Sequence, residues 1–129
     1  MSILAARAGR HERYRHRDTP LLAGCSRRHR VWITETGVGG SRPGGPRPTD
    51  PTSLRAQCRG MEDRLARWHR DPRVQAVFQY SFREDDLFPV GLVDPPLTRL
   101  YEPYDVWAAW ARRRGPDDPP PALPGACRA

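Results

Sequence analysis

The sequence contains no Lys and no Asn, so all 22 of its basic residues are Arg. Arg, Ala, Gly and Pro are used heavily, as a GC-rich coding sequence would dictate. Part of the net charge of +7 therefore reflects codon usage. The charge is also uneven, because residues 1–30 hold eight Arg against two acidic residues, while residues 31–129 hold fourteen against thirteen. The segment that we expect to fold is thus nearly neutral.

Long apolar runs and cysteine motifs are also missing. No run approaches the ~20 apolar residues of a membrane span, and residues 1–9 are too short and too weakly apolar for a secretory signal. Cys25, Cys58 and Cys127 are odd in number and far apart, which argues against a zinc site and against a disulfide framework. These absences predict a soluble product with no metal, no cofactor and no membrane partner, and they leave its cellular location open.

The N-terminal arm, residues 1–29, is rich in Arg and holds three of the four His. Such an arm can bind nucleic acid or another polyanion. Aromatic residues that stack on bases are scarce, however, since Tyr14 is the only one before Trp32. We therefore favour a disordered extension. A small basic protein that binds nucleic acid or another polyanion through residues 1–30 remains the alternative function.

A strand, a helix and a second strand are predicted between residues 31 and 82. The segments 31–37 and 74–82 are rich in apolar, β-branched and aromatic residues, which favours strands. The helix is expected from about Pro51 to His69, with a capping oxygen from Thr49 or Asp50. Its apolar positions recur at spacings of four and three and form one stripe, namely Leu54, Cys58, Met61, Leu65 and Trp68. This order is that of a βαβ unit, so we expect parallel strands and a core-packing role for Cys58.

The remaining segments divide into loops, one helix and a tail. Residues 39–48 are rich in Gly and Pro and are expected to form a loop, and residues 83–86 a charged turn. A last helix is predicted from about Pro103 to Arg113. The Pro-rich tail, residues 113–129, is expected to be disordered. The predicted organisation is therefore a basic arm, a folded segment over residues 30–112 and a disordered tail.

Glu35 is the residue with the clearest chemical potential. It is a single carboxylate at the end of an apolar run, where Glu is disfavoured. In parallel α/β folds the carboxyl ends of the strands carry the functional groups. Taken alone, an exposed glutamate at a strand end is the simpler interpretation. The flanking motifs reverse this preference.

Residues 30–112 resemble the last two βα units of a clan A, cellulase-like glycoside hydrolase, a (β/α)8 barrel enzyme. Residues 31–37 are similar to the seventh-strand segment of that clan, which ends in Thr-Glu-x-Gly and carries the nucleophilic Glu. Residues 77–85 resemble the eighth strand and its turn, and residues 89–107 resemble the closing loop and helix. Only the first motif is chemically specific. The fold class that the resemblance implies is α/β, a partial TIM barrel of two parallel strands and two helices between disordered termini.

The resemblance also implies roles for six residues. Glu35 would be the nucleophile of a retaining glycosidase acting on O-glycosidic bonds. Gln79 and Tyr80 would bind substrate, at positions where many members have Trp. Arg83 and Glu84, with Asp85, would either bind sugar hydroxyls or form a solvated turn, which we favour.

The expected partner is a carbohydrate, provided that the barrel is completed. The acid/base Glu of the clan follows an Asn at the end of the fourth strand, and this sequence has neither. A full barrel needs about 250 residues. We therefore expect a fragment of a glycoside hydrolase that is inactive as a lone chain.

Overall fold

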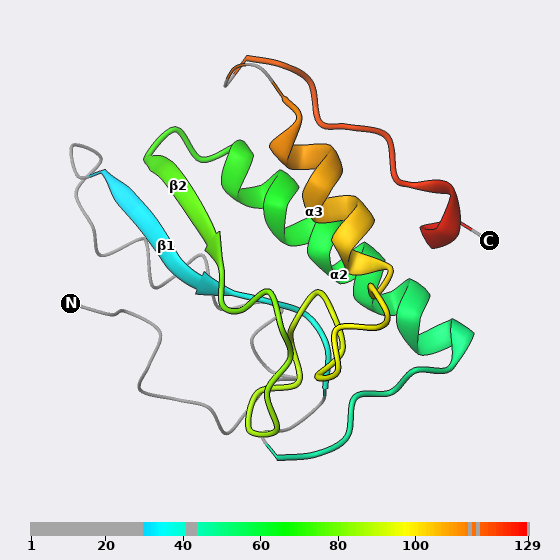
Figure 1. Cartoon of the computed structure of the whole chain (residues 1–129). Coiled ribbons are helices and arrows are strands. Elements are labelled where there is room, and N and C mark those ends of the chain that lie inside the picture. Colours follow the sequence, from blue (N-terminus) through cyan, green and yellow to red (C-terminus); the bar gives the residue numbers. More distant parts are fainter. Residues whose placement is uncertain (1–29, 41–43, 114, 116, 129) are drawn as a thin grey trace.

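The computed structural model describes residues 30–40, 44–113, 115 and 117–128. Its elements follow the order β1 (Val31–Thr36), α2 (Pro51–His69), β2 (Val74–Gln79), α3 (Pro103–Ala111) and a short 3-10 helix, η2 (Gly125–Cys127). The two strands lie side by side, and α2 and α3 run next to one another (Figure 1). The basic arm and its predicted disorder or nucleic-acid binding lie outside the described residues.

The two strands pair in parallel, as the βαβ pattern predicted. The register joins Val31 to Val74 and Thr36 to Gln79, so the carboxyl ends of both strands meet at one end of the sheet. β2 ends three residues before the predicted Phe82. The reason is local, because the backbone carbonyl of Phe82 accepts hydrogen bonds from the following loop instead of from a strand. The structure is thus of the α/β class, with two parallel strands and two helices.

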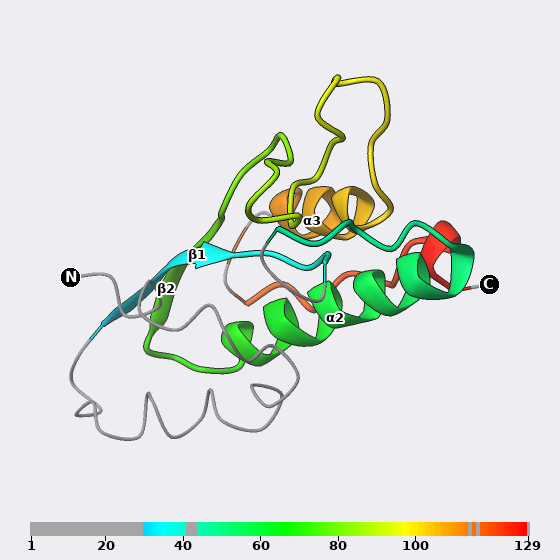
Figure 2. The same ribbon diagram turned by 90° about the horizontal axis from the view of Figure 1, so that it is seen from below.

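Helix α2 has the predicted bounds, and its apolar stripe forms the centre of the core. All five stripe residues are buried, and four of them join a cluster with Val31 and Ile33 of β1. Asp50 is the N-cap, since its carboxylate accepts a hydrogen bond of 3.0 Å from the backbone N–H of Ser53. Figure 2 shows α2 running along one side of the two strands. The local signals of cap, proline and stripe were sufficient to place this helix.

The Asp50 cap leads to a pH-dependent prediction. The pKa of Asp50 is lowered from 3.8, chiefly by hydrogen bonding to Ser53. Because the folded-state pKa lies below the ordinary value, the ionised carboxylate stabilises the fold at pH values above the ordinary pKa. This contribution is lost as the pH falls through the folded-state pKa. Asp50→Asn keeps the cap without titration. We expect the melting temperature of the wild type to fall relative to Asp50→Asn as pH is lowered below about 4, and a constant difference would contradict this role.

Helix α3 ends at Ala111, two residues before the predicted end, and lies against α2. Its residue Val106 is fully buried in the shared core. Trp110 donates a hydrogen bond of 2.7 Å from Nε1 to the Glu62 carboxylate on α2. The two helices are therefore joined by both apolar and polar contacts. None of the helices in the described part of the chain is both long and apolar enough to cross a bilayer.

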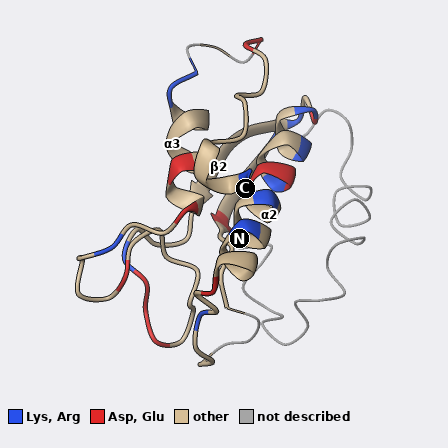
Figure 3. Cartoon of the chain, turned by 90° about the vertical axis from the view of Figure 1, so that its right-hand side faces the viewer, with Lys and Arg blue, Asp and Glu red and all other residues tan. Residues whose placement is uncertain are grey.

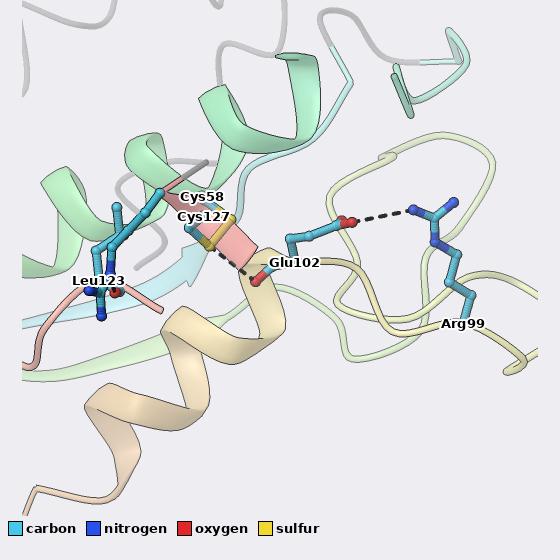
Figure 4. Close-up of a disulfide and its surroundings, with 6 residues drawn as sticks. Cys58, Arg99, Glu102, Leu123 and Cys127 are labelled. Atoms are coloured by element: carbon cyan, nitrogen blue, oxygen red, sulfur yellow. Dashed lines mark hydrogen bonds and ion pairs between the residues drawn. A yellow bond between two sulfur atoms is a disulfide. The ribbon is translucent and has the colours of Figure 1, made fainter. Parts of the chain in front are cut away.

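The C-terminal segment differs most from the sequence-based expectation. Residues 117–128, where we predicted disorder, follow a defined path that ends in η2, and Cys127 is fully buried. Cys127 forms a disulfide with Cys58 on α2, with a Cα–Cα distance of 5.6 Å (Figure 4). The predicted disorder is wrong for these residues, and so is the argument from cysteine spacing against a disulfide. The two cysteines are 69 residues apart, a separation at which sequence spacing carries no information.

Candidate functional site

The candidate site lies at the carboxyl ends of the two strands. Glu35 is next to the end of β1, and Tyr80 directly follows β2. The backbone N–H of Tyr80 donates a hydrogen bond of 2.7 Å to the carbonyl of Thr36, which fixes the two strand ends side by side. Desolvation raises the pKa of the Tyr80 hydroxyl, and the negative charges of Asp85 and Glu35 raise it further. Glu35 and Tyr80 therefore lie at the same end of the sheet.

The Glu35 carboxylate is exposed to solvent. Among the residues that the structure describes, none forms a hydrogen bond or ion pair with this carboxylate. A nucleophilic carboxylate needs neighbours that fix its position. The described residues thus give Glu35 a location suited to chemistry but do not hold its side chain in place.

Tyr80 is one of several exposed aromatic residues on and after the two strands. Its side chain is 39% exposed, and its ring packs edge-on against Phe88 with centroids 5.4 Å apart. Trp32 of β1 and Phe78 of β2 are also exposed, with their rings 6.2 Å apart. An exposed aromatic ring can stack on the apolar C–H face of a sugar or pack against another protein.

Gln79 is directed into the loop that follows β2. Its Nε2 donates hydrogen bonds to the carbonyls of Val90, at 2.7 Å, and of Ser81, at 3.3 Å. Its Oε1 is buried and accepts no hydrogen bond within the described part of the protein. In this conformation the side chain positions the loop, and substrate binding by Gln79 would require it to rotate.

Glu84 is buried in an ion pair that the sequence did not reveal. The guanidinium of Arg47, with a side chain only 2% exposed, lies 2.5 Å from the Glu84 carboxylate. Arg47 also donates to the Gln57 side chain at 2.9 Å and to the carbonyls of Gly91 and Val38. The prediction of a solvated turn is therefore wrong for Glu84. Arg47 gave no signal in the sequence, because it lies in a Gly- and Pro-rich segment that predicts only a loop.

Tyr101 completes this buried cluster. Its ring lies under the Arg47 guanidinium at 3.9 Å, and its hydroxyl is 3.4 Å from the Glu84 carboxylate. Burial raises the pKa of Tyr101, and the charge of Glu84 adds to this effect. Arg47, Glu84 and Tyr101 come from three separate loop segments, so their buried cluster joins these loops. Arg83, by contrast, is exposed and makes a backbone bridge with Val93.

The other features of the site are less specific. In the described ranges, no three His, Cys, Asp or Glu side chains come together as a metal site would need. Figure 3 shows basic and acidic residues interspersed along α2 rather than gathered on one basic face. Comparison with known protein families, with curated proteins and with solved structures finds no match. Any functional proposal therefore depends on the strand ends themselves.

Proposed function

We propose that this chain is the C-terminal part of a retaining glycoside hydrolase with a (β/α)8 barrel, and that Glu35 is its nucleophile. The observation that supports this most strongly is the position of Glu35 and Tyr80 at the carboxyl ends of two parallel strands joined by a helix. In barrels of this kind the active site occupies that end of the strands. The Thr-Glu-x-Gly resemblance then selects Glu35 among the carboxylates.

The proposed chemistry needs two carboxyl groups about 5–5.5 Å apart. Glu35 would attack the anomeric carbon, while an acid from another part of the barrel protonates the leaving oxygen. The same part would supply the hydrogen bonds that fix Glu35, since the described residues supply none. Tyr80 would present its ring to the sugar, and Arg83 would contact hydroxyl groups at the rim. Gln79 and Glu84 would act indirectly, by holding the loop on which Tyr80 and Arg83 depend.

The purified chain alone is expected to show no hydrolysis of aryl glycosides or polysaccharides, because positioning and the acid are absent. The decisive experiment fuses residues 31–128 to the first six βα units of a clan A glycosidase. This range keeps the bond between Cys58 and Cys127. If the fusion is active, Glu35→Gln should lower kcat by roughly 10⁴-fold or more, as removal of a covalent nucleophile does.

The matched control is Asp86→Asn, which removes an exposed carboxylate from the turn after β2. It should leave the turnover of the fusion within a few-fold of the parent. Robust hydrolysis by the unfused chain would contradict the need for the other barrel units. An active fusion in which Glu35→Gln and Asp86→Asn behave alike would exclude Glu35 as the nucleophile.

A further inference from the structure

Both strands of the sheet have an open outer edge. In the described part of the chain the sheet consists of β1 and β2 alone, so each strand is paired on one side only. An open edge exposes backbone N–H and C=O groups that can pair with a further strand. The two strands are parallel and of equal length, six residues each. A strand that joined the edge of β2 in the same direction would therefore continue the existing ladder.

A groove of about 610 Å³ lies between β2 and α3. Most of its lining is apolar, and no residue of β1 contributes to it, so it lies on the side of β2 away from β1. The lining includes Phe78 and Phe82, which are 47% and 57% exposed. The opposite wall is formed by α3 and its C-cap, with Tyr104, Trp107, Ala108, Ala111 and Arg112. Exposed apolar side chains at an open strand edge are typical of a surface that another protein segment covers.

We propose that the occupant of this groove is β1 of a second copy of the chain. β1 offers what the groove requires, namely an open edge, the same strand length and an exposed Trp32, whose side chain is 60% exposed. Within one copy Trp32 and Phe78 share a face of the sheet, since their rings are in contact. Parallel addition of β1 from a second copy beside β2 would place a second Trp32 on that same face, next to Phe78.

This contact is head-to-tail, because the β1 edge of one copy pairs with the β2 edge of another. The β2 edge of the first copy and the β1 edge of the second copy stay free. Such contacts either repeat without end or close into a ring. Parallel βα units close into a barrel at eight strands. Since each copy contributes two strands, the closed assembly expected here has four copies.

The docking does not depend on the proposed glycosidase activity, because it needs only the two edges and the groove. The same edges are where the other βα units of a barrel would join. A second copy is the occupant that the described residues themselves provide. A ring of four copies would still lack the Asn-Glu segment that carries the acid/base residue of clan A glycosidases, because the sequence has no Asn.

The test measures the mass of the assembly by light scattering on full-length protein, with Cys25→Ser as background so that thiol cross-linking does not contribute. The parent should form a complex of four chains. Phe82→Asp places a charge in the groove and should reduce the mass to that of one chain. Leu97→Asp is the matched control, because Leu97 is 58% exposed and lies outside the groove lining. It should leave the complex intact.

A mixing experiment tests the head-to-tail geometry. Trp32→Asp replaces the apolar ring that β1 would bring next to Phe78 of another copy, and Phe82→Asp places a charge in the β2 groove. Both residues are exposed, so both variants should fold. Each variant alone should be monomeric. Mixed together, they should form a one-to-one complex through the intact β1 edge of one and the intact groove of the other. A monomeric parent, an oligomer that persists in Phe82→Asp, or a mixture that stays monomeric would overturn the proposal.

Discussion

Arg47→Met is expected to lower the free energy of unfolding by about 3–5 kcal/mol, which is the effect of removing one partner from a buried ion pair. The substitution would leave the Glu84 carboxylate buried, without its 2.5 Å partner. It would also remove the hydrogen bonds that Arg47 donates to Gln57 and to two loop carbonyls. Denaturation in urea, followed by circular dichroism, measures the change.

Two further variants separate the ion pair from general effects of losing an arginine. Replacing Arg47 and Glu84 together by Met should restore part of the lost stability, because no buried charge then remains. Arg99→Met removes the partner of Glu102 from a half-exposed pair at 3.4 Å. The free energy of unfolding should then change by no more than about 1 kcal/mol, as is usual for surface ion pairs. Equal effects of Arg47→Met and Arg99→Met would show that burial of the Arg47 pair has no special importance.

Reduction of the Cys58–Cys127 disulfide is expected to lower the free energy of unfolding by about 4 kcal/mol. The bond closes a loop across a separation of 69 residues, and constraining a loop of this size in the unfolded chain has about that effect. Cys127→Ser should match the effect of reduction. Cys25→Ser is the control and should change little, since Cys58 and Cys127 pair with each other.

Urea denaturation with and without a thiol reductant measures this effect, and limited proteolysis identifies the part of the chain that responds. Without the bond, residues 117–128 lose their covalent link to α2 and should be cleaved first. Equal midpoints of urea denaturation with and without reductant would contradict the stabilising role of the disulfide. Detection of two free thiols at Cys58 and Cys127 in protein purified without reductant would contradict the bond itself. Disulfides persist in oxidising compartments, so the same experiment bears on where the protein functions.

Local sequence patterns predicted the elements of this fold well. The bounds of α2 were predicted correctly because a cap, a proline and an apolar stripe all lie within its own 19 residues. The parallel pairing followed from two β-rich runs separated by one helix. The meeting of Glu35 and Tyr80 at one end of the sheet followed in turn, since parallel strands bring their carboxyl ends together.

The tertiary structure decided what joins residues that are distant in the sequence. Arg47 and Glu84 are 37 residues apart, and Cys58 and Cys127 are 69 residues apart. No local sequence pattern predicts either pairing, because a buried charge or thiol is stabilised by whichever partner the folded chain brings to it. The sequence by itself therefore determined the helix, the strands and the placement of Glu35. Only the packed chain determined that Glu84 is an internal support and that the C-terminal segment is bound to α2, because both depend on the burial of side chains from separate elements.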